Sequence, residues 1–275
     1  MSWNTLLYEK RGHAACITLN RPDKMNAVSI EMMKELGQLY REVEEDDDVW
    51  TVIVTGAGRK ALCTGADMAV FELTKKNGHI TGIDMWGEPM LANRRQWEVP
   101  QEATPPYLEM TKPIICAVNG VASGAGLDLV STADVAIAAD HATFFDPHVS
   151  IGVVSGREMV RMARVLPLPV AMRMAVMGKH EQLSAQRAYE IGLVTEVVPS
   201  ESLMDRAWEL AEIINRNAPL AVRGTRMAIR KGLSLPIYEA ELLAESYRVR
   251  CAQTDDAEEG PTAFIEKREP VWKGR

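Results

Sequence analysis

The sequence is poor in cysteine and has no cysteine pair at a metal-binding spacing. Its four cysteines, Cys16, Cys63, Cys116 and Cys251, are scattered, and three of them lie in or beside apolar runs. This pattern disfavours structural zinc, and we expect buried free thiols in a reducing cytoplasm.

Long apolar runs and an excess of positive charge are absent as well. No run approaches the ~20 residues that cross a bilayer, and residues 1–10 lack the apolar middle of a signal peptide. The net charge of −7 argues against a nucleic-acid surface, which needs clustered Lys and Arg. We therefore expect a cytoplasmic protein with neither a membrane span nor a nucleic-acid partner.

The composition is that of a globular protein with a sizeable core. The chain has 275 residues, of which 47% are hydrophobic and 25% are charged. Apolar runs at residues 14–20, 50–55, 114–118 and 135–139 predict β-strands. A helical period that follows Ser29 predicts a helix with Ser29 as its N-cap. Strands that alternate with helices in this way predict stacked βαβ units and an α/β fold.

Two regions depart from this alternation. Residues 71–106 combine glycines, prolines and large apolar side chains without a period, which predicts a lid or a binding loop. After residue 199, helical periods at 202–217, 218–231 and 236–254 follow one another without a strand. Their apolar positions exceed what one contact with a core would use. We therefore expect residues 1–199 to form the core and residues 200–275 to form a helical region that packs against another subunit.

Two turns of small residues stand out, and each follows an expected strand. They are Cys-Thr-Gly-Ala-Asp-Met at residues 63–68 and Asn-Gly-Val-Ala-Ser-Gly-Ala-Gly-Leu-Asp at residues 119–128. A helix is expected to begin near Gly124, and the unpaired N–H groups of its first turn would point at an anion or a developing oxyanion. One such turn is usually only a turn, so the information lies in the pair.

Motifs in order along nearly the whole chain resemble the crotonase superfamily, the enoyl-CoA hydratase/isomerase family. The resembling residues are 17–22 (Ile-Thr-Leu-Asn-Arg-Pro), 26–27, 63–67, 112–120 (Lys-Pro-Ile-Ile-Cys-Ala-Val-Asn-Gly), 133–134, 144, 147, 183–185, 192–194 and 259–268. The resemblance implies a crotonase-type spiral of ββα units with a helical C-terminal trimerisation region. It also implies a homotrimer, or a hexamer that is a dimer of trimers.

The resemblance further implies an acyl-CoA thioester substrate and the residues that bind it. In this family two backbone N–H groups bind the thioester oxygen, and the matching residues are Ala66 and Ala125, the second of which is commonly Gly. Coenzyme A enters as part of the substrate, with no other cofactor and no metal. The residues that match its binding segments are Lys24, Met25, Ala27, Asp67 and Met68, together with Phe264 and Lys267, which could reach the CoA of this or a neighbouring subunit.

The sequence departs from the family at the two glutamates with which its hydratases hold and activate water. Asp128 stands at the first position and His148 at the second. Asp128 follows Ala125 by one helical turn, so it can face the same cavity. His148 can act as a base near neutral pH, because the ordinary pKa of histidine is ~6.5, and an ionised Asp128 nearby would orient its ring. Asp146 could also orient His148 if this segment is extended, since both side chains would then point the same way.

A third family position, which sometimes carries a catalytic Asp, is Gly156 here, so that variant of the chemistry is disfavoured. Arg157 and Glu158 follow at the expected start of a helix. We expect them to form a surface pair rather than an ion pair of the active site.

The predicted activity is that of an enoyl-CoA hydratase-like enzyme, which adds water to a 2,3 double bond through an enolate held in an oxyanion hole. His148 and Asp128 would position and deprotonate the water. Three alternatives stay open. One is a hydrolase of C–C bonds in a β-dicarbonyl or ring substrate, because neutral histidine can activate water against a ketone. The others are an enoyl-CoA isomerase, which needs one base, and a catalytically dead acyl-CoA-binding protein.

Overall fold

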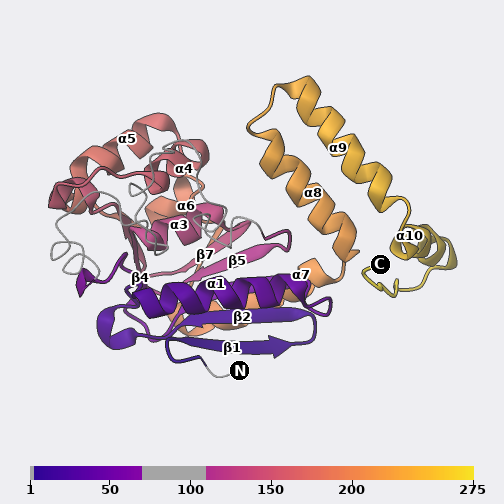
Figure 1. Cartoon of the computed structure of the whole chain (residues 1–275), viewed down its shortest axis with the longest axis horizontal. Helices are drawn as coiled ribbons and strands as arrows, with labels where there is room; N and C mark the ends of the chain where they lie inside the picture. The colour runs from indigo at the N-terminus through magenta and orange to yellow at the C-terminus, as the bar shows by residue number, and fades with distance from the viewer. Residues whose placement is uncertain (1–2, 70–109) are drawn as a thin grey trace, which may run out of the picture.

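Two β-sheets form the framework of the chain (Figure 1). The computed structural model describes residues 3–69 and 110–275, so the predicted lid or binding loop at 71–106 lies outside the described residues. The larger sheet has the strand order β1-β2-β3-β5-β7-β10, and the smaller has the order β4-β6-β8-β9. The strands of the larger sheet are β1 (Leu6–Arg11), β2 (Ala14–Leu19), β3 (Thr51–Gly56), β5 (Ile114–Val118), β7 (Val135–Ala139) and β10 (Glu196–Val198). Those of the smaller sheet are β4 (Ala61–Cys63), β6 (Val121–Ser123), β8 (Thr143–Phe145) and β9 (Leu183–Ser184).

Two successive turns of the chain each add one strand to each sheet and then a helix. β5 is followed by β6 and by α3 (Ala125–Thr132), and β7 is followed by β8 and later by α4 (Arg157–Val165). Successive turns pair in parallel, β3 with β5 and β5 with β7 in one sheet, β4 with β6 and β6 with β8 in the other. The structure therefore confirms the predicted α/β spiral of ββα units.

The long strands match their predicted ranges because they are buried. β5 and β7 have the predicted limits, β2 ends one residue early and β3 begins and ends one residue late. All five residues of β5 are buried, as is typical of a parallel strand covered on both faces. The strands that the sequence did not predict are β1, a largely exposed edge strand, and segments of two or three residues that are too short to show a period.

Helix α1 (Ile30–Glu45) covers one face of the larger sheet, and its start is the predicted one. Ser29 Oγ accepts a hydrogen bond of 3.1 Å from Met32 N. At the other end, the fully buried Lys112 donates from Nζ to the carbonyl oxygens of Val43, at 2.5 Å, and Asp46, at 2.6 Å. Burial lowers the pKa of Lys112 to about 8. Lys112 thus satisfies carbonyl groups that the end of a helix leaves without partners.

Helix α7 (Leu203–Asn215) packs on the opposite face of the larger sheet. Its residues Leu203, Ala207, Trp208 and Ala211 are buried in a cluster with side chains of β2, β3, β5 and β7. The predicted boundary at 199/200 lies just before this helix. The helical region that projects from the core begins only after α7, at α8 (Pro219–Gly232). Helices α8 and α9 (Ile237–Cys251) form a hairpin that projects from the core, with α10 (Asp255–Glu266) beyond it (Figure 1).

The three predicted C-terminal helices are confirmed within three residues at each end. Helix α10 was not predicted, because Pro261 lies inside it. Its signal was Thr254, whose side chain accepts from Ala257 N, followed by three acidic residues in the first turn. No helix in the described ranges is both long and apolar enough to span a bilayer.

The hairpin leaves large apolar side chains without cover from its own chain. Helix α9 has no buried residue. The large hydrophobic residues exposed on the hairpin and its turn are Ile229, Leu233, Leu235, Ile237, Tyr238, Leu242 and Val249. This is the excess of apolar surface that the sequence predicted for the C-terminal region.

Replacing Lys112 tests how much the buried ammonium stabilises the fold. In Lys112→Met the carbonyl oxygen of Val43 loses the ammonium donor and that of Asp46 keeps only Val49 N, at 2.9 Å, so we expect a loss of ~1–3 kcal/mol in the free energy of unfolding. Urea unfolding at a fixed protein concentration measures it. The matched control is Lys34→Met on the exposed face of α1, for which we expect a change within ~0.5 kcal/mol. Equal small effects in both variants would contradict the role given to Lys112.

Candidate active site

Three turns meet at one edge of the smaller sheet, because its parallel strands β4, β6 and β8 end there. β4 is followed by Gly65 and Ala66, β6 by Gly124 and Ala125, and β8 by a turn that carries His148. The carboxyl ends of parallel strands share an edge, and this edge is where α/β folds commonly place a site.

The first two turns touch through glycines. Gly65 has φ +97° and Gly124 has φ +52°, a region that side chains rarely allow. A Cβ on Gly124 would stand 3.1 Å from Gly65 Cα, closer than ordinary contact permits. The close approach of the two turns therefore requires glycine at 124, whereas Gly65, whose Cβ would meet Gly124 Cα at an ordinary 3.7 Å, is favoured by its φ alone.

Ala66 and Ala125 directly follow these glycines, and their backbone N–H groups donate no hydrogen bond to another residue of the described part of the chain. The residues around Ala66 are fixed, since Val28 N donates to Gly65 O at 2.8 Å and Asp67 N donates to Val28 O at 2.9 Å. Ala125 opens α3, so its N–H is one of the donors that a helix start leaves unpaired. Two backbone donors thus come together where the sequence predicted an oxyanion hole, and their role stays a prediction.

Helix α3 is held at both ends. All of its residues are buried, and a Cβ on Gly126 would stand 2.4 Å from Cys63 O, so the helix lies directly on β4. At its C-terminal end, Arg230 of α8 donates from Nη2 to Thr132 O at 2.7 Å and to Ala133 O at 2.6 Å. The position of Ala125 is therefore fixed by packing below and by a cation at the far end of the helix.

His148 is held by a buried carboxylate. Asp146, whose side chain is fully buried, accepts at Oδ1 from His148 N at 2.8 Å and from His148 Nδ1 at 2.7 Å. Ser155 Oγ donates to the other oxygen, Oδ2. A carboxylate only accepts, so Nδ1 carries the proton and Nε2 is the acceptor of the neutral ring. The ring lies against the second turn, because Cε1 is 3.9 Å from where a Cβ of Gly124 would be.

The contact between Asp146 and His148 forms, but not in the extended segment that the sequence analysis assumed. Pro147 has φ −90° and ψ −10°, and His148 begins a short 3-10 helix, η4 (His148–Ile151). The turn, rather than the two-residue period of a strand, brings both groups of His148 to one carboxylate oxygen. The sequence missed Ser155, which precedes α4.

Hydrogen bonds set the charge of this pair. The hydrogen bond to Asp146 raises the pKa of His148, against burial, which lowers it, and the charges of Asp146, Glu158 and Asp128 raise it further. Burial alone would raise the pKa of Asp146, but hydrogen bonds from His148 and Ser155 outweigh it, so this pKa lies below its usual range. The pair therefore favours a carboxylate beside an imidazole that accepts a proton readily.

Asp128 is buried, with 1% of its surface exposed, and faces arginines of α4. Its carboxylate lies 3.5 Å from Arg161 Nη1 and 3.9 Å from Arg157 Nη2. The expectation that Asp128 orients the His148 ring is wrong in this respect, because Asp146 holds the ring. The expected surface pair is also wrong, since Arg157 faces Asp128 and Glu158 is 5% exposed. The sequence did carry a signal for this contact: Arg157 and Arg161 are four residues apart, so they lie on the same face of α4.

The model of the family described as enoyl-CoA hydratase/isomerase matches residues 9–275. The chain belongs to the enoyl-CoA hydratase/isomerase family. It is similar to a short-chain-enoyl-CoA hydratase of Clostridium acetobutylicum, 34% identical over 98% of this chain and 97% of the relative. It is also similar to an (E)-benzylidenesuccinyl-CoA hydratase of Thauera aromatica, 34% identical over 97% of this chain and 98% of the relative.

A solved structure shares the fold closely. The crystal structure of an enoyl-CoA hydratase/isomerase from Mycobacterium paratuberculosis covers all of this chain and is covered fully by it, with 54% identity and a TM-score of 0.86. Membership of the enoyl-CoA hydratase/isomerase family, which the sequence motifs indicated, is therefore confirmed over the length of the chain.

Most of the residues that match the family's CoA-binding segments lie together. Lys24 and Met25 end a short 3-10 turn, η1 (Pro22–Lys24), and Met25 has φ 53°. Arg21 ties this loop to the first turn, because its Nη1 donates to Ala27 O at 2.6 Å and its Nη2 lies 2.7 Å from Asp67 Oδ2. Met68 follows and is 67% exposed. The loop and the turn thus form one surface beside Ala66.

The two C-terminal residues are not part of that surface within one chain. Phe264 is 85% exposed on α10, and Lys267 ends this helix with φ 55°. Helix α10 lies at the opposite end of the molecule from β4 (Figure 1). Phe264 and Lys267 therefore lie away from the Ala66 surface of their own chain, and their role stays a prediction.

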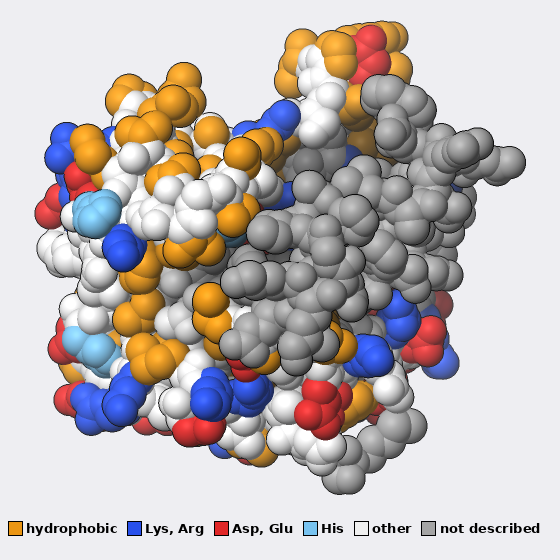
Figure 2. Space-filling model, turned by 60° about the vertical axis from the view of Figure 1, so that its left-hand side comes forward, with side chains coloured by type: hydrophobic (Ala, Val, Ile, Leu, Met, Phe, Trp, Pro, Cys, Tyr) orange, Lys and Arg blue, Asp and Glu red, His pale blue; other side chains and the backbone are white. Residues whose placement is uncertain are grey.

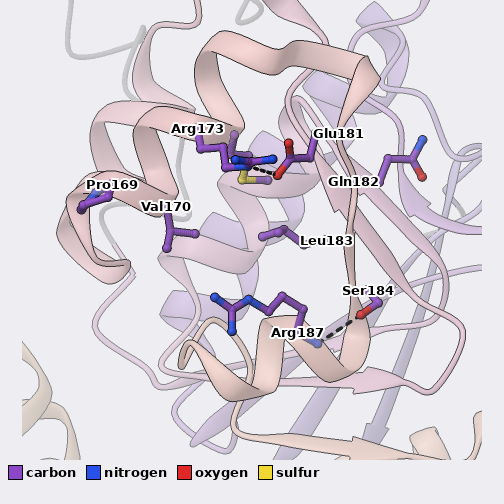
Figure 3. A pocket seen from close by; sticks show the side chains of 9 residues that line it. Pro169, Val170, Arg173, Glu181, Gln182, Leu183, Ser184 and Arg187 are labelled. Atoms are coloured by element: carbon purple, nitrogen blue, oxygen red, sulfur yellow. Dashed lines mark hydrogen bonds and ion pairs between the residues drawn. The ribbon is translucent and has the colours of Figure 1, made fainter.

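A separate cavity of about 460 Å³ lies between α5 (Leu168–Met177), β9 and α6 (Ala185–Glu190) (Figure 3). Arg173 and Glu181 form an ion pair across it at 2.5 Å, while Val170 and Leu183 line it with apolar groups. None of its lining residues is one that the sequence predicted for the site. Leu168, Met172 and Val176 on α5 are exposed. Figure 2 shows exposed hydrophobic side chains scattered over the side of the molecule that it presents.

A further finding concerns metals. Within residues 3–69 and 110–275, no three His, Cys, Asp or Glu side chains gather in a group that could hold a metal ion. Cys16, Cys63 and Cys116 are buried and free, as the sequence predicted, and Cys251 is half-buried.

A methyl group on Gly126 tests the seating of α3. In Gly126→Ala the new Cβ would stand 2.4 Å from Cys63 O, so the helix must shift, and we expect a loss of ~1–3 kcal/mol in the free energy of unfolding. Urea unfolding measures it. In the control Gly224→Ala on α8 the Cβ meets Tyr247 Cβ at 3.6 Å, an ordinary contact, and alanine favours the helix, so stability should hold or rise by up to ~1 kcal/mol. A neutral Gly126→Ala would contradict the tight seating.

Proposed function

We propose that this protein is an enoyl-CoA hydratase, in which the backbone N–H groups of Ala66 and Ala125 bind the thioester oxygen and His148 is the base that activates water. The observation that carries the proposal is the contact between the two glycine turns, with the imidazole of His148 against the second of them. Oxyanion-hole donors contribute to such reactions because they stabilise charge that develops in the transition state.

Hydration would proceed by addition of water at C3 and then protonation of C2. His148 Nε2 takes a proton from water as the oxygen forms a bond to C3 of the enoyl group. The π electrons of the C2–C3 bond move toward the carbonyl, and the negative charge of the enolate lies on the thioester oxygen. C2 then takes a proton from the imidazolium, which restores neutral His148 and the C=O bond. Coenzyme A is part of the substrate, and these steps use no metal and no other cofactor.

Asp128 has a narrower role in this scheme. Its carboxylate is paired with Arg157 and Arg161, so it serves as an acceptor that holds the water rather than as a proton donor. Asp128 and His148 therefore take the place of the family's two glutamates but have different roles. Asp128 positions the water, and His148 transfers the proton.

The relatives support hydration without fixing the acyl group. Their printed names include a short-chain-enoyl-CoA hydratase and a hydratase of (E)-benzylidenesuccinyl-CoA, whose acyl groups differ greatly. We propose an acyl-CoA substrate with a 2,3 double bond and a cytoplasmic location. The C–C hydrolase, the isomerase and the catalytically dead binding protein are less favoured, because these relatives are named for adding water to an enoyl-CoA.

Removing either side chain tests the pair. His148→Ala should lower kcat by ~10²–10⁴-fold, the range for groups that transfer a proton in the transition state. Asp128→Ala should also lower kcat strongly, because the water loses the carboxylate that positions it, and CoA affinity should stay nearly unchanged in both variants. The double variant should lose little more than the worse single one, because residues that act as a unit are not additive. Hydration of a panel of enoyl-CoAs, followed by mass detection of +18 Da products, and calorimetry with CoA give the two readouts.

His141→Ala is the matched control, since His141 also pairs with an aspartate, at 3.3 Å, but in an exposed turn. We expect wild-type kcat in that variant. If His148→Ala keeps most of the activity, the base is another group. If the panel yields a shifted double bond or a shortened or ring-opened acyl group in place of +18 Da products, hydration is the wrong reaction.

We further propose that the protein is a homotrimer or a dimer of trimers, in which the α8–α9 hairpin packs on a neighbouring copy and brings Phe264 and Lys267 to the neighbour's CoA. The support is the uncovered apolar side of the hairpin and the distance of α10 from the site of its own chain.

Light scattering at micromolar concentration should give three or six times the chain mass of 30.5 kDa. Leu242→Glu, on the exposed side of α9, should lower that mass, because the charge would have to be buried without a partner. Glu241→Gln, exposed on the same helix, is the control and should leave it unchanged. A mass of one chain for the wild type would contradict the proposed assembly.

A further inference from the structure

We propose that Asp146 is a positioning residue for His148: held by Ser155, it fixes the imidazole with its proton on Nδ1 and with Nε2 as the acceptor on the side of the Gly124 turn. The inference rests on the proposed function only in taking His148 as the base. It assigns the duty of setting the base to Asp146 rather than to Asp128.

The clamp follows from the contacts of one carboxylate. Oδ1 of Asp146 accepts from the backbone N of His148 at 2.8 Å and from its Nδ1 at 2.7 Å, so the backbone and the ring are fixed by the same atom. Ser155 Oγ donates to Oδ2 and stops the carboxylate from rotating. Asp146 is fully buried, whereas the His148 side chain is 20% exposed. Water therefore has little access to the carboxylate and can reach the ring.

The tautomer follows from the same contacts. Both oxygens of Asp146 already accept from donors, and the bond to the ring is made at Nδ1. The other ring nitrogen, Nε2, is left to accept a proton, which is what a base next to a bound water needs. When the ring takes that proton, the imidazolium lies beside a buried negative charge, and this stabilises the charged state.

The charged groups around His148 rank in a definite order. Asp146, in the turn before η4, has the largest effect through its hydrogen bond, and Glu158 of α4 and Asp128 of α3 act only through their charges. The charge of Asp128 is also partly offset by Arg161, at 3.5 Å, and Arg157, at 3.9 Å. The protonation of His148 should therefore depend more on Asp146 than on Asp128.

Asp146→Asn separates charge from shape. The amide oxygen can keep both bonds to His148 while the amide NH₂ donates to Ser155 Oγ, so the ring stays in place and only the negative charge is lost. The titration of His148 should then move to lower pH. Asp128→Asn removes one charge from the other side of the site, and Asp140→Asn removes the carboxylate of the exposed Asp140–His141 pair as a control.

The test is NMR titration of the ¹⁵N-labelled full-length protein without substrate, with the His148 ring signals identified by their loss in His148→Gln. In the wild type, the ¹⁵N shifts of the neutral ring should report a proton on Nδ1. The midpoint should move to lower pH in Asp146→Asn, move less in Asp128→Asn, and stay in place in Asp140→Asn. On the best enoyl-CoA substrate, kcat for Asp146→Asn should fall, by up to the ~10⁴-fold lost when such a change also reverses the ring tautomer, and the acid limb of kcat/KM should shift to lower pH.

A neutral wild-type ring with its proton on Nε2 would overturn the inference. This measurement needs no variant, so the inference can be tested even if a variant fails to fold. A midpoint that Asp128→Asn moves more than Asp146→Asn does would also overturn it. The NMR arm is independent of turnover. If it gives the expected results and no enoyl-CoA is hydrated, the clamp stands and the proposed function fails.

Discussion

The contact between Gly65 and Gly124 is the constraint on which the site depends. A side chain on Gly124 would stand 3.1 Å from Gly65 Cα, so any residue but glycine would push the two turns apart. Because Ala66 and Ala125 follow directly, the spacing of their N–H groups is fixed by this contact. Backbone donors set in this way need no reorganisation when charge develops on a substrate oxygen.

The spiral explains why three distant segments meet there. β4, β6 and β8 are parallel neighbours in the smaller sheet, and each is followed within a few residues by one part of the site. The first two supply backbone donors, and the third supplies the Asp146–His148 pair. Helix α3 joins these parts to the rest of the chain, since it lies on β4 at Gly126 and is capped by Arg230 of α8. The C-terminal hairpin is therefore connected, through α3, to the turn that carries Ala125.

Much of this could be predicted from the sequence, and the limits have physical causes. The buried strands β5 and β7 were predicted to the residue because parallel strands covered on both faces are continuous apolar runs. The short strands of the smaller sheet, which position the site, carry no such signal. His148 and Asp128 were identified only through family resemblance, since a single His or Asp has no pattern of its own.

The partners of those residues were harder to predict. Whether Asp146 or Asp128 holds the His148 ring depends on a turn at Pro147 and on the packing of α4, neither of which shows in local composition. The Arg157–Glu158 pair looked like surface because charged residues at a helix start usually are. Arg157 instead faces Asp128, which lies across the interface between α3 and α4 and also attracts Arg161.

The most direct test of the central claim is a crystal structure of the protein with acetoacetyl-CoA, whose enolate resembles the proposed intermediate. We expect the thioester oxygen to accept hydrogen bonds from the N–H groups of both Ala66 and Ala125, at about 2.7–3.1 Å, and His148 Nε2 to face C3 of the bound acyl group. A thioester oxygen bound away from these two N–H groups would contradict the proposed oxyanion hole.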